Sequence, residues 1–172
     1  ADGTVLLADE QLSGKGRLGR TWTAPAGTQL AMSAALDVAD HTEDLGWLSL
    51  LAGLAAVQGV DDAMGIRPTL KWPNDVLIDG KKVAGILSEY TRSEHAAGGP
   101  GGVAVIGTGL NTTMAEEQLP VPTATSLRLA TGRDVPLTEL AASYLRSLSE
   151  LLDLWPHDLD GLAARDRADS DT

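Results

Sequence analysis

The sequence predicts one α+β domain, in which a mixed, mainly antiparallel sheet is flanked by helices. Several short apolar runs contain β-branched residues, two longer segments carry apolar residues at helical spacing, and strand and helix do not alternate strictly. At 172 residues the chain is long enough for one well-packed domain. Because Phe is absent and aromatic residues make up only 3%, we expect a core of Leu, Val, Ile and Ala.

The first three elements are two strands and a helix. Residues 4–8 are a short apolar run, which predicts a buried strand. Residues 29–38 alternate loosely between apolar and polar and fit a second strand. Residues 45–64 contain no proline and repeat apolar residues at helical spacing, so we expect a long, buried central helix.

A hairpin is expected in the middle of the chain. Residues 69–72 form a strand that Pro73 ends. Residues 76–78 and 82–90 flank Asp79-Gly80, a dipeptide that suits a type I′ turn. This is the clearest hairpin signal in the sequence.

The last third of the chain should add a strand, a helix and a tail. The glycine-rich residues 96–102 predict a flexible loop, and residues 103–106 predict a strand running into 107–111. A capped helix is expected from about 138 to 155. Residues 163–172 are polar and acidic and predict a frayed tail.

Composition excludes several classes of function. A net charge of −11 disfavours non-specific binding to nucleic acid or to an anionic membrane, and no apolar run approaches the roughly 20 residues of a membrane span. Zero cysteines exclude a disulfide framework and cysteine-based metal sites or catalysis. The three histidines, His41, His95 and His157, lack metal-ligand spacing. With no signal peptide visible, we expect a cytoplasmic protein.

A local reversal of charge marks the first candidate site. Residues 11–36 contain no acid but hold three bases, Lys15, Arg17 and Arg20, among glycines. Glycines let backbone amides approach an anion, and the bases supply charge-assisted hydrogen bonds. A phosphate or carboxylate ligand is one interpretation, and a solvated basic turn is the other.

Two nucleotide motifs are excluded by context. Gly14, Gly16 and Gly19 match G-x-G-x-x-G, but residues 21–27 are extended and broken by proline and glycine where a dinucleotide fold requires a helix. The Gly-Lys-Ser/Thr of a Walker phosphate loop occurs nowhere in the chain.

A second group of candidates surrounds a rigid turn. Lys71 ends a strand just before Pro73, so its ammonium can be aimed at a developing negative charge. Asn74 and Asp75 either hold the turn or, for Asp75, bind Mg²⁺. Gly85 inside an apolar strand suggests close approach of a ligand or another backbone. Residues 107–111 place glycines and an amide at a strand end, where they suit a flat heterocycle.

Three pieces occur in order between residues 9 and 111: Glu-Gln with G-K-G-R-L-G-R-T-W, K-W-P-N-D-V with K-K-V-A-G-I-L, and I-G-T-G-L-N. Together they resemble the motif set of biotin protein ligases. The resemblance implies the biotin-lipoate ligase catalytic fold, which is related to class II aminoacyl-tRNA synthetases. It also implies an enzyme that activates biotin with ATP and Mg²⁺ to biotinyl-5′-AMP and transfers it to a lysine of a biotin carboxyl carrier protein domain.

The resemblance implies roles for individual residues. Arg17 and Lys71 would be catalytic, with Lys71 bridging the biotin carboxylate and the ATP α-phosphate. The residues it places at biotin are Gln11, Gly14, Lys15, Gly16, Arg17, Lys71, Val76, Gly85 and Gly107. Those it places at the nucleotide are Arg17, Arg20, Trp22, Lys82 and Asn111, with Asp75 as the Mg²⁺ candidate. Homodimers are common in the family.

The sequence departs from the family pattern in three places. Lys15 stands where arginine is commoner, which keeps the charge but loses the planar fork. The family's Ser/Thr-Thr-Asn strand, which contacts biotin, and its C-terminal SH3-like domain are not found in these residues. We therefore expect a catalytic core over residues 1–162, shortened at both ends and followed by the tail. With no helix-turn-helix and a charge of −11, we expect no DNA binding.

Two alternatives stay open. A lipoate ligase or a lipoyl/octanoyl transferase shares the fold and the acyl-adenylate logic. A non-catalytic module that binds biotin, nucleotide or only a partner protein belongs to a different class of function.

Overall fold

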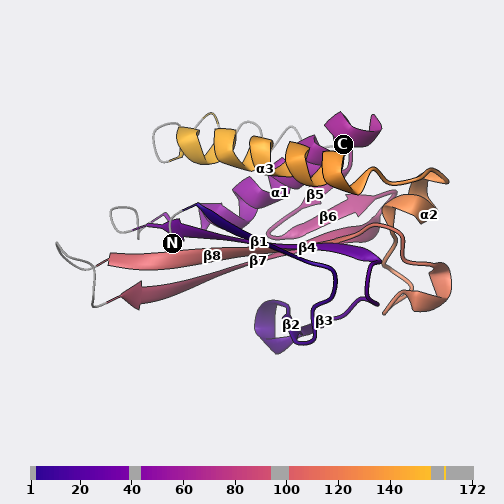
Figure 1. The fold of residues 1–172 in the computed structure, drawn as a ribbon, viewed down its shortest axis with the longest axis horizontal. Helices are drawn as coiled ribbons and strands as arrows, with labels where there is room; N and C mark the ends of the chain where they lie inside the picture. The colour runs from indigo at the N-terminus through magenta and orange to yellow at the C-terminus, as the bar shows by residue number, and fades with distance from the viewer. Residues whose placement is uncertain (1–2, 39–43, 94–100, 156–160, 162–172) are drawn as a thin grey trace.

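The computed structural model describes residues 3–38, 44–93, 101–155 and 161. One six-stranded sheet carries two long helices, α1 (Trp47–Met64) and α3 (Leu137–Leu154), on one face, and a small two-stranded hairpin lies on the other face (Figure 1). The predicted α+β class is confirmed. None of the described helices is long and apolar enough to cross a membrane.

The strands of the large sheet run in the order β1-β4-β8-β7-β6-β5, and every neighbouring pair is antiparallel. Their bounds are β1 (Thr4–Ala8), β4 (Gln29–Asp37), β5 (Thr69–Lys71), β6 (Asp75–Ile78), β7 (Lys81–Ser93) and β8 (Gly101–Asn111). The smaller elements are β2 (Gly14–Lys15), η1 (Arg17–Gly19), β3 (Thr21–Trp22), η2 (Glu116–Gln118) and α2 (Leu127–Thr131). The sequence patterns had predicted none of these five short elements.

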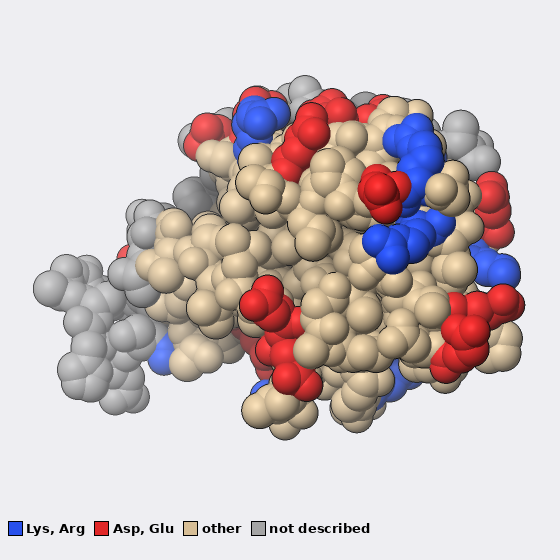
Figure 2. Space-filling model, turned by 45° about the vertical axis from the view of Figure 1, so that its right-hand side comes forward, with Lys and Arg blue, Asp and Glu red and all other residues tan. Residues whose placement is uncertain are grey.

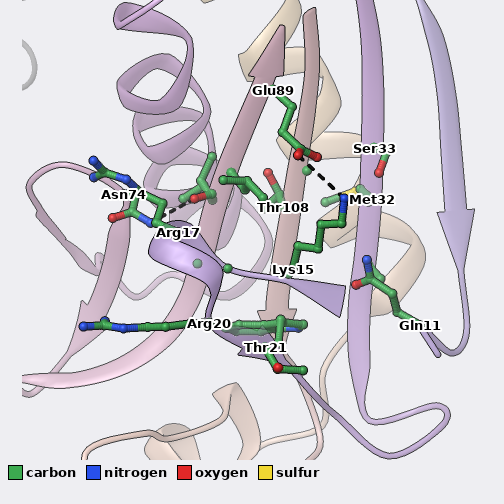
Figure 3. A pocket seen from close by; sticks show the side chains of 18 of the residues that line it. Gln11, Lys15, Arg17, Arg20, Thr21, Met32, Ser33, Asn74, Glu89 and Thr108 are labelled. Carbon is green, nitrogen blue, oxygen red and sulfur yellow. Dashed lines mark hydrogen bonds and ion pairs between the residues drawn. The ribbon is translucent and has the colours of Figure 1, made fainter. Parts of the chain in front are cut away.

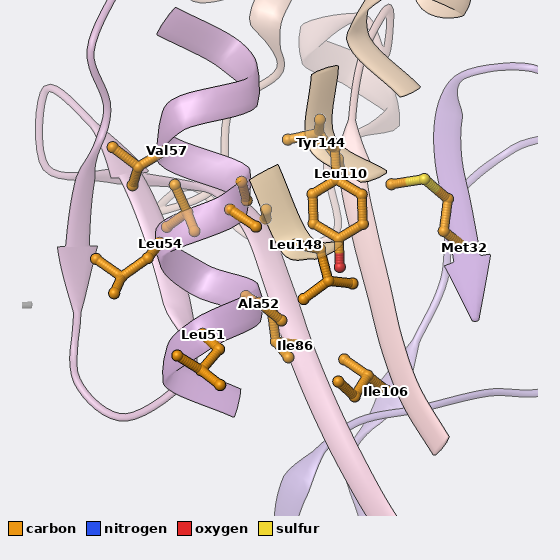
Figure 4. Close-up of a cluster of buried hydrophobic side chains, with 14 of the residues drawn as sticks. Met32, Leu51, Ala52, Leu54, Val57, Ile86, Ile106, Leu110, Tyr144 and Leu148 are labelled. Carbon is orange, nitrogen blue, oxygen red and sulfur yellow. The ribbon is translucent and has the colours of Figure 1, made fainter. Parts of the chain in front are cut away.

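The two faces of the sheet differ in chemistry because side chains alternate along each strand. On the helix side, residues such as Met32, Ile86, Ile106 and Leu110 are buried against α1 and α3 (Figure 4). On the opposite face the central strands carry small residues. That face therefore leaves space above the middle of the sheet.

Helix α1 is buried almost all round, as predicted, because the sheet covers one side and α3 covers another. Its residues Leu51, Ala52, Leu54 and Val57 are 2% exposed or less. Figure 4 shows them between α1 and the strands. The helix ends at Gly65, whose φ of +63° is the left-handed conformation that glycine adopts without strain.

The predicted central hairpin is confirmed. Strands β6 and β7 are joined by Asp79 and Gly80, which have φ values of +50° and +74°. Positive φ at both central positions is the signature of a type I′ turn.

Three expectations about elements were wrong. Strand β1 forms at residues 4–8 but is not buried, since it is an edge strand and Leu6 is 66% exposed. The glycines of 107–111 lie inside β8 rather than past its end, because their backbone pairs with β4 and β7. Helix α3 begins at Leu137 with Pro136 at its N-cap, and no side chain caps it.

The expected loop at 96–102 lies mostly outside the described residues. The expected tail at 163–172 and the three histidines lie wholly outside them.

A buried phenol ties α3 to the sheet and predicts a pH dependence of stability. Tyr144 on α3 shares a 2.7 Å hydrogen bond with the Thr108 hydroxyl of β8, and burial raises the pKa of Tyr144 to about 12. The folded chain thus holds this proton more tightly than the unfolded chain, where the pKa is 10.0. Its stabilising contribution is full below pH 10 and is lost as pH rises towards 12, by on the order of 2–3 kcal/mol.

We expect the urea midpoint of unfolding to decrease as the pH rises from 10.0 to about 12, the window between these two pKa values. Tyr144→Phe should be less stable than the parent at pH 8, because Thr108 loses its partner. It should also show a shallower loss at high pH, since lysine titration remains but the phenol does not. Equal slopes for both proteins would contradict the assignment.

Candidate active site

The basic segment folds into a compact arch. Strands β2 and β3 pair antiparallel, with Gly14 opposite Trp22, and η1 forms the bend between them. A Cβ at Gly14 would collide with the Trp22 carbonyl, so only glycine allows this approach. Leu18 at the bend has φ +58°, a left-handed conformation that is strained for leucine. The glycines therefore shape the arch, and from it Lys15 reaches Glu89 of β7.

A pocket of about 900 Å³ lies between this arch and the open face of the sheet (Figure 3). Small side chains from the central strands form its floor: Ala31, Ser33, Gly85, Gly107 and Gly109. The register explains this floor, since Ser33 pairs with Gly107, Ala31 with Gly109, and Gly109 with Gly85. The floor is therefore nearly flat over four strands, counting Ala8 of β1, which pairs with Ala31.

The pocket brings together most of the residues predicted from sequence. The predicted residues that line it are Gln11, Lys15, Gly16, Arg17, Arg20, Trp22, Lys71, Asp75, Lys82, Gly85 and Gly107. Gly14 lines an adjoining hollow, which shares Lys15, Arg17 and Glu89 with the pocket.

Two predicted site residues lie elsewhere. Val76 is fully buried in the hydrophobic core beside its partner Ala84 and does not line the pocket, so its contact with biotin stays a prediction that this geometry does not support. Asn111 is 3% exposed and does not line the pocket. Its Nδ2 donates to the Thr125 carbonyl at 3.0 Å, so the segment before α2 holds it inside the protein.

The charges in the pocket are unequally satisfied. Lys82 Nζ lies 2.5 Å from Asp75 Oδ1, and Lys15 Nζ lies 3.9 Å from Glu89 Oε1. Within the described part of the chain no ion pair engages the cations of Arg17, Arg20 or Lys71. These three cations lie in a chain of net charge −11, and the face in Figure 2 carries both signs of charge in small separate groups. The pocket therefore favours an anion.

Trp22 forms one wall of the pocket. Its indole lies on the glycine floor, within 2.6 Å of the position that a Cβ on Gly109 would occupy. The same ring lies near Gly85, and Lys82 Nζ is 5.6 Å from its centroid, within cation–π range. Glycine at positions 85 and 109 thus makes room for the ring.

The turn that follows Lys71 is fixed to β7. Asn74 Nδ2 donates to the Ile86 carbonyl, and the Ile86 amide donates to the Asn74 carbonyl, both at 2.9 Å. These contacts support the prediction that Asn74 holds the turn. The bonds fix the turn next to Lys71, which is exposed at the end of β5 and lines the pocket.

Several residues at the site were not predicted, and four of them are polar or charged side chains near the predicted ones. Glu10, Ser33 and Glu89 line the pocket, and Gln29 contacts Trp22 behind it. Glu89 could have been predicted from the alternation of side chains along β7, because Gly85, Leu87 and Glu89 are every second residue and share one face of the strand. An acid is not expected from a basic segment that predicts an anion site.

Metal ligands are sparse in this region. No group of three or more His, Asp or Glu side chains able to hold a metal occurs among residues 3–38, 44–93 and 101–155. Asp75 offers one carboxylate to the pocket, and Lys82 already contacts it.

Comparison with known proteins places the chain among ligases. Residues 1–111 match the biotin/lipoate A/B protein ligase family. The chain is 41% identical to the biotin–[acetyl-CoA-carboxylase] ligase of Mycobacterium tuberculosis over 98% of its own length and 61% of that protein. It thus spans about three fifths of that relative's length.

Solved structures agree with the family match. Biotin protein ligase from Aquifex aeolicus in complex with biotin and ATP superposes with a TM-score of 0.74 at 32% identity, covering 91% of this chain and 63% of that one. Biotin protein ligase from Leishmania major in complex with biotinyl-5-AMP superposes with a TM-score of 0.77, covering 98% of this chain and 71% of that one. At 23% identity the latter shows the shared fold alone.

Proposed function

The chain belongs to the biotin/lipoate A/B protein ligase family, and from this premise we propose that it activates biotin with MgATP and passes the biotinyl group to a carrier-protein lysine. The observation that carries the proposal is the pocket itself. Arg17, Arg20 and Lys71 line this pocket together with a floor of small residues, with no acid paired to them in the described part of the chain.

The first step joins two anions, so cations and positioning supply the catalysis. A biotin carboxylate oxygen attacks the α-phosphorus of ATP, the bond to the β-phosphate oxygen breaks, and pyrophosphate leaves. Lys71 holds the carboxylate against the α-phosphate and offsets the repulsion between them. Arg17 and Arg20 bind the phosphate oxygens from the arch. No protein nucleophile is required.

In the second step the amine of a carrier lysine attacks the acyl carbon of the mixed anhydride. The carbon–oxygen bond to AMP breaks, AMP leaves, and the nitrogen loses a proton as the amide forms. The arch shields the anhydride from water until the carrier arrives. The partner is then a biotin carboxyl carrier domain, consistent with the name of the Mycobacterium tuberculosis relative.

Magnesium fits this pocket as part of the substrate MgATP. Mg²⁺ is commonly held by one or two carboxylates together with substrate phosphates and water. Asp75 provides one carboxylate beside Lys82, so the ion would be held mainly by the triphosphate. When bound it would neutralise the departing pyrophosphate.

Biotin is favoured over lipoate as the acid. The Aquifex aeolicus protein, which is 32% identical, has a structure with biotin and ATP, and the Mycobacterium tuberculosis relative bears a biotin ligase name. Gln11 and Ser33 add polar groups to the lining of the pocket, with which a ureido ring can form hydrogen bonds. Since this reaction consumes ATP, we propose a cytoplasmic location.

The test is exchange of radiolabelled pyrophosphate into ATP, with biotin, lipoate, octanoate or no acid present. Exchange that depends on biotin alone supports the proposal. Exchange that depends on lipoate or octanoate would instead support the alternative function, a lipoate ligase or a lipoyl/octanoyl transferase. If no acid supports exchange, calorimetry with biotin and MgATP separates a binding module from a chain that binds neither. Transfer is then read as a mass increase of a purified carrier domain.

A further inference from the structure

We propose that Gln29 is a positioning residue that fixes the Trp22 indole and thereby sets the affinity of the pocket for the nucleotide. The inference rests on the proposed function, because it assigns Trp22 to the ATP end of the pocket. Gln29 itself does not line the pocket. It acts through the ring that does.

The contact between the two residues is short and directional. Trp22 Nε1 donates to Gln29 Oε1 at 2.7 Å. The indole N–H is the ring's single hydrogen-bond donor, so this bond fixes one edge of the ring. It also settles the orientation of the Gln29 amide, because only the oxygen can accept.

The remaining contacts of the ring leave it free to turn. Gly85 and Gly109 beneath it have no side chains to hold its edges. Lys82 lies over the ring at 5.6 Å, a contact with little preference for rotation in the plane. Among the described residues, the hydrogen bond to Gln29 is the directional contact that this indole makes.

An amide at position 29 is costly for the fold alone. Gln29 is 4% exposed, and its Nε2 has no hydrogen-bond partner among the described residues. A half-satisfied buried amide costs free energy that an apolar side chain of similar shape does not. What the glutamine does provide is the acceptor for Trp22.

The register places this effect at the nucleotide end of the pocket. Gln29 begins β4 opposite Asn111, and the next pair on the same face, Ala31 with Gly109, lies under the indole. Ser33 with Gly107 forms the following pair, farther from Trp22 and towards the proposed biotin end. A tilt of the ring should therefore disturb ATP before it disturbs biotin.

The test compares Gln29→Met, Gln29→Glu and Trp22→Phe in the exchange assay. Gln29→Met removes the acceptor but keeps the length of the side chain, and should raise the KM for ATP about tenfold while the KM for biotin changes less than about twofold. Gln29→Glu keeps an oxygen acceptor on the same stem and should recover most of the loss. In a Trp22→Phe background, Gln29→Met should add nothing further. Gln58→Met, the same change on α1, is the matched control and should behave as the parent.

An NMR readout keeps the contact testable without turnover. The Trp22 indole N–H signal is identified by its loss in Trp22→Phe, and in Gln29→Met it should move upfield and exchange faster with solvent. If the parent shows no exchange activity, the proposed function fails. The inference about Gln29 is then tested separately, by comparing the Kd of the same variants for MgATP. A shifted signal with a weaker Kd or a higher KM supports the inference. An unchanged nucleotide affinity in Gln29→Met, by either measure, overturns it.

Discussion

Replacing Lys71 by alanine is expected to lower biotin-dependent pyrophosphate exchange by about 10²- to 10³-fold, the range seen when one preorganised group is removed from a developing charge. Lys71 lines the pocket, and no acid is paired with its ammonium within the described residues. Its loss leaves the carboxylate and the α-phosphate facing each other without a shared cation. Because Lys71 is exposed, the unfolding midpoint should change little.

Two variants make the result specific to position 71. Lys81→Ala removes the same charge from an exposed residue that does not line the pocket, and should exchange like the parent. Lys71→Arg keeps the charge but replaces a compact ammonium with a wider planar group, and should recover only part of the rate. If Lys71→Ala keeps more than about one fifth of the parent rate, the bridging role belongs to another cation, with Arg17 the first to test.

Local chemistry made some elements predictable and left others open. The turn at Asp79-Gly80 was predictable because few dipeptides tolerate positive φ at both positions. The burial of β1 was not, because an apolar run has the same composition at the edge of a sheet as at its centre. Its place in the sheet depends on pairing with β4, which local sequence does not encode.

The candidate site residues fall into the same two groups: some are predictable from local sequence, and others depend on how distant strands pair. Arg17 and Lys71 were identified because a basic stretch in an acidic chain and a strand-ending turn are visible locally. The position of Val76 depends on register, and a shift by one residue exchanges the two faces of a strand. The register between β6 and β7 does shift, between Val76 and Leu77. Motif matching cannot see such a shift.

Asn111 shows a further limit of prediction from the sequence. It has the same parity as Gly109 on the open face of β8, so its sequence position suits the pocket. The segment before α2 returns over it, and Thr125 accepts its hydrogen bond. A contact between residues 14 positions apart across an irregular segment leaves no periodic pattern. The role of Gln29 could not be predicted for a related reason: its partner Trp22 lies in the arch, and the contact depends on how the arch folds over the sheet.

The second large effect is a loss of stability, and it is expected from a substitution between the two helices that pack on this sheet. Gly59→Val is expected to destabilise the fold by about 3 kcal/mol, the upper part of the range for overpacking a core. A Cβ at Gly59 would lie 2.8 Å from both the amide nitrogen and the Cα of Tyr144. These are backbone atoms of α3, so the two helices must move apart. For a chain of this size, the thermal midpoint should fall by about 6–12 °C, measured by circular dichroism.

Gly53→Ala separates this clash from the effect of losing a glycine. Position 53 lies on the same helix, but an added Cβ there meets the Leu70 Cδ1, the end of a flexible side chain that can turn away. Alanine also gains about 1 kcal/mol of helix propensity over glycine, so the loss at position 53 should be small or absent. If Gly59→Val unfolds at the parent's midpoint, then α1 and α3 do not approach this closely.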